Sequence, residues 1–214
     1  MNIENQIEAA HRLLNIKAVK LSPEQPFTWT SGRRSPIYCD NRLILSYPLI
    51  RTFIKEQFVC LVKEICEDVE VIAGVATGGI PQGVLVAQEL NKPFVYVRPE
   101  AKSHGMKNQI EGTLYPNQTV VVIEDLISTG KSSLFAVDTL RNAGAIVKGM
   151  AAIFTYELDI AKKNFAEKQV ELKTITNYSI LIETAIKEEY VSKQNLASLN
   201  EWRENPEKWS DDRL

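Results

Sequence analysis

The chain has 214 residues, 44% of them hydrophobic and 24% charged, a composition typical of one globular domain with a small appended subdomain. Its formal net charge is −2, so it lacks the basic excess of general nucleic-acid binders, and any anion it binds must be held by a few local cations. No apolar run approaches the length of a membrane span, so neither nucleic acid nor a membrane is an expected partner.

The first part of the chain predicts two helices separated by irregular structure. Apolar residues at helical spacing indicate helices over residues 3–14 and 48–67, and Pro48 is suited to open the second. Residues 17–42 hold three prolines and a glycine among aromatic side chains, which indicates short extended pieces and turns.

From residue 71 onward, short β-branched runs alternate with helices. Strands are expected at 71–76, 94–97, 119–123, 146–154 and 172–176, and helices at 81–90 and 132–142. This alternation predicts an α/β fold with a central, mostly parallel five-stranded sheet flanked by helices. Ligands of such sheets bind at the carboxyl ends of the strands. The residues expected there are Thr77, Gly78, Gly79, Arg98, Glu124 and Asp125.

The segment VVVIEDLISTGKSS, Val120 to Ser133, places two acids at the end of a buried strand and a hydroxyl-rich turn before a helix. Backbone N–H groups in such a turn, together with the helix dipole, form an anion site, and Gly130 lets a phosphate approach the backbone. Carboxylates beside a phosphate are explained if they accept ribose hydroxyls or face a hard cation that bridges the ligand. The segment therefore predicts a site for a ribose phosphate–pyrophosphate and Mg²⁺.

Two other interpretations of this segment compete with the first. A nucleoside-triphosphate loop shares the Gly-Lys-Ser at 130–132, but it needs a glycine five residues before Gly130, where this chain has Asp125. An ordinary helix start capped by Ser128 or Thr129 is common and needs no ligand. The paired acids followed by hydroxyls and a glycine favour the ligand site.

The segment RPEAKSHG at 98–105 opens a loop longer than a simple connector. Pyrophosphate is a poor leaving group unless its charge is neutralised, so mobile cations that close over it would assist its departure. Arg98, Lys102 and His104 are suited to that role. Taken alone, the loop is equally well explained as a solvated surface segment; the neighbouring anion site favours catalysis.

The segment from Val120 to Ser133 resembles the donor-binding motif of the type I phosphoribosyltransferases. The resemblance implies a small N-terminal hood subdomain on the acceptor side, residues 1–68, and a core with a C-terminal helical segment, residues 69–214. It implies that Glu124 and Asp125 contact ribose hydroxyls and that residues 128–132 surround the 5-phosphate. The implied donor-binding set is Arg98, Lys102, His104, Glu124, Asp125, Leu126, Ile127, Ser128, Thr129, Gly130, Lys131 and Ser132.

Two further segments resemble the orotate phosphoribosyltransferases of the same superfamily. The pattern R-x-E-x-K-x-H-G at 98–105 is similar to their catalytic loop, and PFTWTSGRRSPIYCDNR at 26–42 is similar to their acceptor segment. The resemblance places Tyr38 against the pyrimidine ring and Ser128 in a hydrogen bond with the base. It makes Lys102, His104 and Asp125 the catalytic residues. Mg²⁺ would be carried by the diphosphate near Asp125, without direct protein ligands.

The implied reaction moves ribose 5-phosphate from 5-phospho-α-D-ribose 1-diphosphate to orotate in pyrimidine synthesis. Lys102 or His104 either donates a proton or only neutralises charge, and the scarcity of titratable groups favours neutralisation. The resemblance further implies a homodimer in which loop 99–113 is shared across subunits.

The sequence departs from the family pattern at several positions. Pro99 stands where a lysine often follows the arginine, and Thr30 and Gly78 stand where some members have lysines. Residues 154–159, FTYELD, lack the arginine with which some members meet the acceptor. Arg33 or Arg34 could supply that charge instead.

Two alternative functions are kept open. A purine phosphoribosyltransferase would share the donor motif but should lack both the Tyr38 segment and the loop at 98–105. A regulatory protein that binds the donor without turnover, and also binds nucleic acid, should show a basic face or a helix-turn-helix, which the sequence does not suggest.

The remaining residues of note have structural interpretations. Cys39, Cys60 and Cys66 are odd in number, which excludes a full disulfide framework, and the last two are expected to be buried hydrophobes in a reducing cytosol. The acidic N-terminus lacks a signal core, so a cytoplasmic location is expected. Trp29 is expected to pack in the core, and Trp202 and Trp209 to dock the C-terminal segment.

Overall fold

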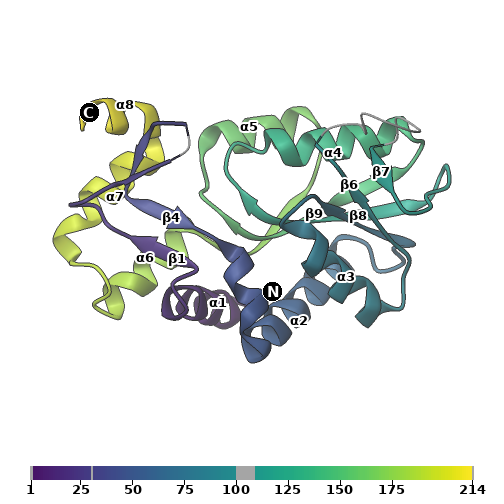
Figure 1. Ribbon diagram of the computed structural model, residues 1–214, viewed down its shortest axis with the longest axis horizontal. Helices are drawn as coiled ribbons and strands as arrows, with labels where there is room; N and C mark the ends of the chain where they lie inside the picture. Colours follow the sequence, from purple (N-terminus) through teal and green to yellow (C-terminus); the bar gives the residue numbers. More distant parts are fainter. Residues whose placement is uncertain (1, 30, 100–108, 214) are drawn as a thin grey trace.

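The computed structural model describes residues 2–29, 31–99 and 109–213, and its centre is a six-stranded sheet in the order β10-β9-β8-β5-β6-β7 (Figure 1). Five strands run parallel, as their β-branched runs predict. They are β5 (Val71–Val75), β6 (Phe94–Val97), β8 (Thr119–Ile127), β9 (Ile146–Thr155) and β10 (Leu172–Asn177). The expected five strands are therefore confirmed.

The sixth strand, β7 (Ile110–Glu111), was not expected from the sequence. It pairs antiparallel with the end of β6, with Ile110 opposite Val97 and Glu111 opposite Tyr96. Two residues cannot produce a recognisable alternation of apolar and polar side chains, and these two lie in a polar region. The sheet is thus one strand wider than predicted.

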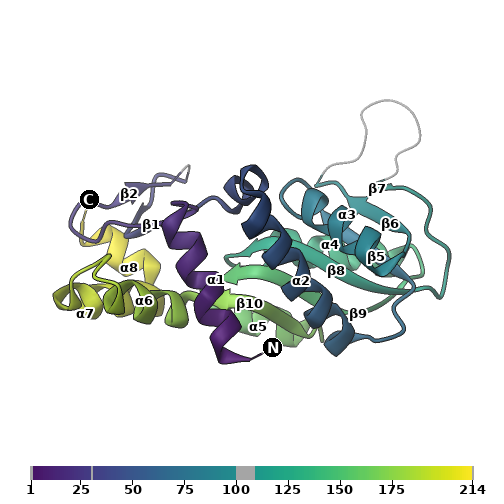
Figure 2. The same ribbon diagram turned by 90° about the horizontal axis from the view of Figure 1, so that it is seen from below.

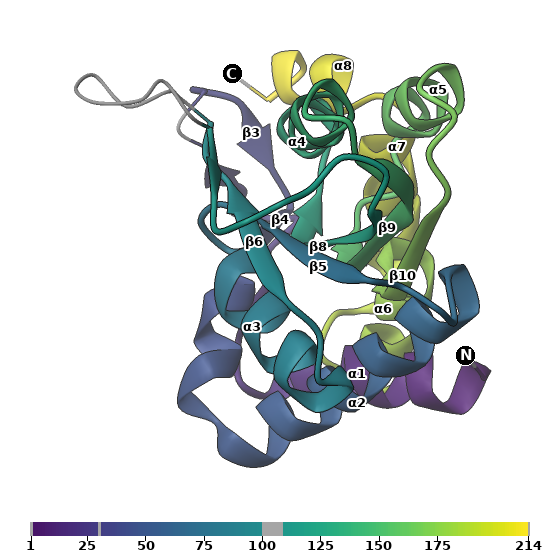
Figure 3. The ribbon, with the colours of Figure 1, turned by 90° about the vertical axis from the view of Figure 1, so that its right-hand side faces the viewer.

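Both faces of the sheet are covered by helices, as predicted. Along β8, Val121 and Ile123 point into one hydrophobic core, and Val120 and Val122 point into another. Figure 3 shows the helices on the two sides of the sheet. One face carries α1 (Ile3–Asn15), α2 (Pro48–Ile65) and α3 (Gly79–Leu90), and the other carries α4 (Lys131–Asn142) and α5 (Asp159–Glu167).

The N-terminal segment between the first two helices forms short strands and turns, as its prolines and aromatic residues indicate. β1 (Val19–Leu21) pairs antiparallel with β4 (Ile37–Cys39), and β2 (Phe27–Thr28) with β3 (Arg34–Ser35). The 3₁₀ helix η1 (Asn41–Ser46) then leads into α2.

The C-terminal helices lie against this N-terminal segment at one end of the molecule (Figures 1 and 2). α6 contacts α1, and α8 contacts β3. Trp202 is 1% exposed and Trp209 0%, which confirms that both dock this part of the chain. The elements are α6 (Tyr178–Lys187), η2 (Lys193–Asn195), α7 (Leu196–Glu204) and α8 (Pro206–Asp211).

All three cysteines are free, but the expectation for Cys60 was wrong. Cys66 is buried, whereas Cys60 is exposed on the same outward stripe of α2 as Thr52 and Glu56. The four-residue spacing of these three positions puts them on one helix face, which here is the solvent face. None of the helices that the structure describes is both long and apolar enough to cross a bilayer.

Candidate functional site

The carboxyl ends of β5, β6 and β8 meet at one edge of the sheet, where the sequence predicts ligand-binding residues. The turn after β5 contains a cis peptide between Ala76 and Thr77. A Cβ atom on Gly78 would lie 2.1 Å from Oδ2 of Asp125, and one on Gly79 would lie 2.4 Å from the carbonyl oxygen of Ile123. The turn therefore approaches the end of β8 so closely that a side chain at position 79 would meet the backbone of β8, and one at position 78 would displace the Asp125 carboxylate.

Glu124 turns inward from the end of β8. Its side chain is 5% exposed; Oε1 accepts the N–H of Asp125 at 3.0 Å, and Oε2 accepts the hydroxyl of Ser133 at 2.8 Å. Burial raises the pKa of Glu124 well above its ordinary value, and the neighbouring charge of Asp125 adds to the rise. Both carboxyl oxygens of Glu124 are thus engaged within the protein.

Asp125 is the more accessible acid of the pair. Burial raises the pKa of Asp125, while the side chain of Glu124, backbone N–H groups and the charge of Arg42 act in the opposite direction. Its main-chain carbonyl oxygen accepts the side-chain amide of Asn41 at 2.6 Å. Of the two predicted ribose-binding carboxylates, Asp125 therefore has the side chain available to a ligand.

The turn at residues 128–132, called here the hydroxyl-rich turn, leads into α4 without a side-chain cap. The N-cap residue is Gly130 at φ +78°, and no side chain caps the helix. The alternative of a helix start capped by Ser128 or Thr129 is therefore wrong. The first N–H groups of a helix have no partner within the helix, so this end is suited to bind an anion.

Packing fixes the backbone of the hydroxyl-rich turn. A Cβ on Gly130 would lie 2.7 Å from the ring of Phe165 on α5, so α5 approaches to where only glycine fits. Asn164, also on α5, donates its side-chain amide to the carbonyl oxygen of Thr129 at 2.9 Å. The turn is thereby held in place before any ligand arrives.

The other residues of the implied donor set lie around this turn. Ser128 and Thr129 are partly exposed, and Lys131 and Ser132 are exposed. Ile127 is fully buried, so only its backbone can meet a ligand, whereas Leu126 is partly exposed.

Arg98 lies at the start of the loop predicted to cover the leaving group. Its N–H donates to the carbonyl oxygen of Gln109 at 2.9 Å, and its guanidinium lies 3.4 Å from Oε1 of Glu111. These contacts join the two ends of the loop. Lys102 and His104 lie outside the described residues.

A cavity of about 430 Å³ lies beside the hydroxyl-rich turn and contains both predicted acceptor residues. Tyr38 and Ser128 line it from opposite parts of the chain, together with Leu126 and Tyr156. The Tyr38 side chain is 40% exposed, and its ring lies 5.8 Å from that of Phe27. The structure thus brings the two acceptor residues together in one apolar space suited to a flat ring.

Trp29 packs as expected and also lines this cavity. Its Nε1 donates to the carbonyl oxygen of Ile37 at 3.2 Å, and its ring meets that of Trp202 edge-on at 6.0 Å. Sequence reasoning missed Tyr156, which follows β9 directly and is 3% exposed. Its place after a predicted strand, at the ligand-binding edge, is a signal that could have identified it.

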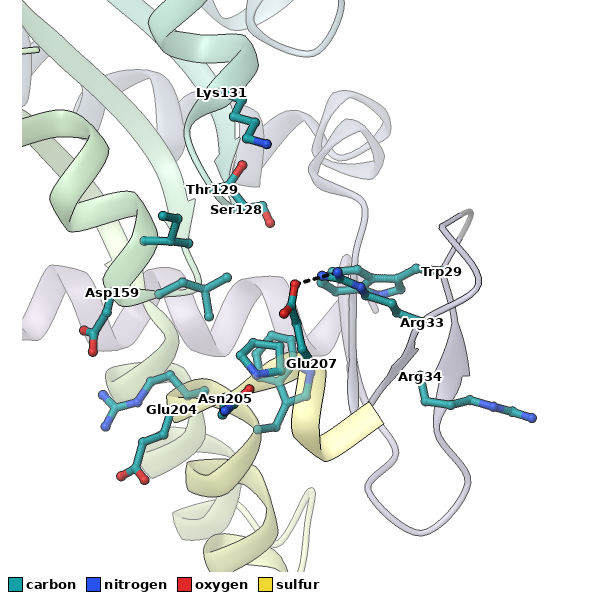
Figure 4. A pocket seen from close by; sticks show the side chains of 15 residues that line it. Trp29, Arg33, Arg34, Ser128, Thr129, Lys131, Asp159, Glu204, Asn205 and Glu207 are labelled. Carbon is teal, nitrogen blue, oxygen red and sulfur yellow. Dashed lines mark hydrogen bonds and ion pairs between the residues drawn. The ribbon is translucent and has the colours of Figure 1, made fainter. Parts of the chain in front are cut away.

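A larger cavity of about 590 Å³ adjoins the first and shares Trp29 and Ser128 with it. Figure 4 shows the hydroxyl-rich turn and Lys131 on one side and the C-terminal helices on the other. Arg33 reaches toward Glu207, with which it forms an ion pair at 2.5 Å, whereas the Arg34 side chain extends away from the cavity (Figure 4). Both candidate arginines line this cavity, and the guanidinium of Arg33 is the one directed across it in Figure 4.

Within residues 2–29, 31–99 and 109–213, no group of three or more His, Cys, Asp or Glu side chains is placed to hold a metal ion. Asp125 is a partly exposed carboxylate at the ligand-binding edge. A hard cation at this edge would therefore depend mainly on ligand oxygens.

The chain is similar in sequence and in fold to known phosphoribosyltransferases. A family model described as a phosphoribosyl transferase domain matches residues 50–189. The orotate phosphoribosyltransferase of Listeria innocua serovar 6a is 54% identical over 209 residues, 98% of this chain and 99% of that protein. The structure of orotate phosphoribosyltransferase from Aeropyrum pernix, 29% identical, covers 86% of this chain and 99% of its own with a TM-score of 0.74. UMP synthase from Leishmania donovani, 26% identical, covers 92% of this chain with a TM-score of 0.77, and this chain spans only 42% of it.

Proposed function

Since the chain belongs to the phosphoribosyltransferase family and, within it, to the orotate phosphoribosyltransferases, we propose that it transfers ribose 5-phosphate from 5-phospho-α-D-ribose 1-diphosphate to orotate. The products are orotidine 5′-monophosphate and diphosphate, in the synthesis of UMP. The observation that carries the proposal is the uncapped start of α4 beside Asp125, next to a cavity lined by Tyr38 and Ser128.

The donor is held at the carboxyl end of β8. The free N–H groups at the start of α4 and the hydroxyls of Ser128, Thr129 and Ser132 bind the 5-phosphate. Asp125 accepts hydrogen bonds from the ribose hydroxyls. Glu124 acts indirectly, because both of its carboxyl oxygens accept hydrogen bonds inside the protein. The bond that it accepts from the N–H of Asp125 fixes the backbone of that residue.

The reaction joins N1 of orotate to C1 of the ribose as the bond from C1 to the pyrophosphate oxygen breaks, and the proton that N1 carried passes to the departing diphosphate. Both electrons of the broken bond leave with the diphosphate, so positive charge develops on the sugar ring. Arg98, Lys102 and His104 neutralise the departing charge, and the carboxylate of Asp125 lies near the cationic ribose. When bound, Mg²⁺ would supply further neutralisation of that charge, and Asp125 is the residue that would lie near it.

The acceptor lies in the 430 Å³ cavity, with its ring against Tyr38 and a hydrogen bond from Ser128. Orotate carries a carboxylate, and no cationic side chain lines this cavity among the described residues. Arg33 lines the adjoining cavity and faces it, whereas Arg34 points away (Figure 4). Arg33 is therefore the arginine that meets the acceptor carboxylate.

The active unit is a homodimer in the cytoplasm, with loop 99–113 reaching the site of the partner copy. Exposed apolar side chains on η1, the start of α2 and α3 support a subunit interface there, because these elements contact one another. They are Leu43, Tyr47, Leu49 and Val84, and Leu49 is 83% exposed.

The test is a spectrophotometric assay of the full chain with phosphoribosyl diphosphate, Mg²⁺ and orotate. Loss of orotate absorbance should require all three components and should fall at least about 10²-fold in Lys102→Ala, since that change removes a charge from the departing diphosphate. Lys148→Ala is the matched control, because Lys148 is exposed near the start of β9, at the opposite edge of the sheet.

A wild-type protein that binds the donor by calorimetry but leaves orotate unchanged would refute the proposal. A screen of adenine, guanine, hypoxanthine, xanthine and uracil would then separate a transferase for another base from a donor-binding regulatory protein. Omitting Mg²⁺ while keeping the donor and orotate tests the metal requirement separately.

A further inference from the structure

Asn41 lies at the junction between the acceptor side and the donor side of the proposed site. It is the first residue of η1, two positions after Cys39 and three after Tyr38, both of which line the acceptor cavity. Despite being an amide on a short connecting segment, it is only 2% exposed. Burial of such a polar side chain is unfavourable unless its donors and acceptors are satisfied.

Both ends of the Asn41 amide are engaged. Nδ2 donates to the carbonyl oxygen of Asp125 at 2.6 Å, across 84 positions of sequence, and Oδ1 accepts the thiol of Cys39 at 3.4 Å. Burial and the neighbouring carboxylate of Asp125 raise the pKa of Cys39 well above its ordinary value, so the thiol keeps the proton that it donates. The amide therefore bridges the acceptor wall and the donor strand.

The Asp125 carbonyl that accepts from Asn41 lies on the part of β8 that extends beyond its pairing with β5. β5 pairs with β8 only as far as Ile123, so the described part of β5 offers no ladder partner to the residues that follow. Asn41 supplies a hydrogen bond on this stretch. The carbonyl of Asp125 also belongs to the peptide that leads into Leu126, which lines the acceptor cavity.

Asp125 is confined on other sides as well. Its N–H is held by Oε1 of Glu124, and its carboxylate lies where a side chain on Gly78 would have to be. With the carbonyl held by Asn41, the backbone of Asp125 is fixed with respect to the wall that carries Tyr38.

We propose that Asn41 is a positioning residue, whose bridge from Cys39 to the Asp125 carbonyl sets the distance between the acceptor base and the donor ribose. The proposal rests on the proposed transfer reaction. A misplacement of about 1 Å between reacting groups lowers rates by up to about 10²-fold, so a single well-placed amide can control turnover. The 5-phosphate site, formed by the hydroxyl-rich turn, is independent of this bridge.

The test is Asn41→Asp, which keeps the shape of the side chain and replaces the amide donor with a carboxylate facing a carbonyl oxygen. We expect kcat to fall by about 10²-fold and the donor KM to change by less than about threefold, because the phosphate contacts remain. When protonated, the new carboxyl can donate to the Asp125 carbonyl again. The ratio of variant to wild-type kcat should therefore rise as pH falls from about 8 to about 6.

The groups that act on the new carboxyl are known. Burial and the carboxylates of Asp125 and Asp40, which raise the pKa of the adjacent Cys39, should likewise raise the pKa of the new carboxyl, and the charge of Arg42, which lowers the pKa of Asp125, should oppose them. Wild type and variant both contain these neighbouring groups. The ratio of variant to wild-type kcat at each pH therefore corrects for the effect of their titration on kcat. Asn41→Ala has no carboxyl that could take up a proton, so its ratio of variant to wild-type kcat should not change with pH.

Asn5→Asp is the matched control. Asn5 donates its side-chain amide to Oε1 of Gln57 at 2.9 Å, between α1 and α2 and away from the site, so its loss should leave kcat and its pH profile unchanged. If Asn41→Asp does not fold, Asn41→Ser, which is too short to span the bridge, takes its place, and a low kcat with an unchanged donor KM is again expected.

A kcat within about threefold of wild type in the folded variant, or a ratio that does not change with pH, would overturn the role of Asn41. If the wild-type protein turns over no base, the proposed function is refuted instead. The wild-type samples of the same experiment provide this measurement. If the wild type uses a base other than orotate, the same variants are compared with that base.

Discussion

The hydroxyl of Ser133 donates to Oε2 of Glu124 at 2.8 Å, in the interior beneath the hydroxyl-rich turn. Ser133 belongs to the first turn of α4 and is 1% exposed, and Glu124 lies on β8, so the bond ties the helix start to the strand end. With Oε1 already held by the N–H of Asp125, this bond keeps Glu124 turned inward and leaves Asp125 as the acid available to a ligand.

The buried position of Glu124 predicts a pH-dependent stability. Its pKa is raised in the folded protein, so above the ordinary value of about 4.3 the folded state holds a proton that the unfolded state has lost. The free energy of unfolding contributed by this group therefore falls as pH rises from about 4.3 through the raised pKa. Glu124→Gln, which mimics the protonated acid, should gain melting temperature relative to wild type across this range.

Thermal melts of the ligand-free proteins measure this difference, with Glu56→Gln on the exposed face of α2 as the control. A melting-temperature difference that is the same at acidic and neutral pH would show that Glu124 titrates normally in the folded protein.

Removal of the Ser133 hydroxyl should destabilise the fold. In Ser133→Ala one oxygen of the buried Glu124 side chain loses its donor, and an unsatisfied buried group costs about 1–3 kcal/mol. Urea unfolding measures the loss. Ser132→Ala, at the adjacent exposed position, should change stability by less than about 0.5 kcal/mol. Equal effects of the two changes would mean that the bond to Glu124 contributes nothing.

The left-handed backbone of Gly130 predicts a change in both stability and donor binding. Alanine at φ +78° costs about 1–2 kcal/mol, and its Cβ would meet the ring of Phe165 at 2.7 Å, so Gly130→Ala must shift the hydroxyl-rich turn. Calorimetry with the phosphoribosyl donor should show affinity reduced by at least about tenfold, because the N–H groups at the start of α4 move.

Gly144→Ala is the control for backbone strain alone. Gly144 also has a positive φ, +88°, and a Cβ there would meet Pro116 at 3.2 Å, away from the hydroxyl-rich turn. It should lose stability but keep its donor affinity. Donor affinity that is unaffected by Gly130→Ala would contradict the assignment of this turn to the 5-phosphate.

Much of the fold was predictable because its signals are local. The β-branched run at Val120–Ile123 and its counterparts indicated parallel strands, and parallel strands bring their carboxyl ends to one edge. The placement of Asp125 and the turn after β5 at that edge followed from this rule. The presence of Tyr38 and Ser128 in one cavity came instead from resemblance to a family, since nothing local joins them.

The features that were missed depend on packing between distant segments. Asn41 bonds to a carbonyl 84 positions away, and no local pattern marks it. A helix start capped by Ser128 or Thr129 stood as an alternative because hydroxyls are the commoner caps, whereas contact with Phe165 decides the backbone at Gly130. The exposed side of α2 at Cys60 depends on which helix face meets the sheet, which apolar neighbours alone do not specify.

The two arginines of the acceptor segment are predicted to differ in function. Arg33 lines the larger cavity and forms an ion pair with Glu207 in which the two side chains are 53% and 67% exposed, whereas the Arg34 side chain extends away (Figure 4). An exposed pair of this kind is worth little, so Arg33 can exchange Glu207 for the acceptor carboxylate. Arg33→Gln should therefore raise the KM for orotate by at least about tenfold and leave the donor KM nearly unchanged.

Arg34→Gln is the matched control, because it removes the same charge from the adjacent position and should leave the orotate KM within about twofold of wild type. Glu207→Gln provides an independent check, since it removes the carboxylate that competes for Arg33 and should lower the orotate KM. Equal effects of the two arginine changes would mean that general positive charge attracts the acceptor and that Arg33 makes no specific contact. An orotate KM that rises in Glu207→Gln would show instead that Glu207 holds Arg33 in its binding position.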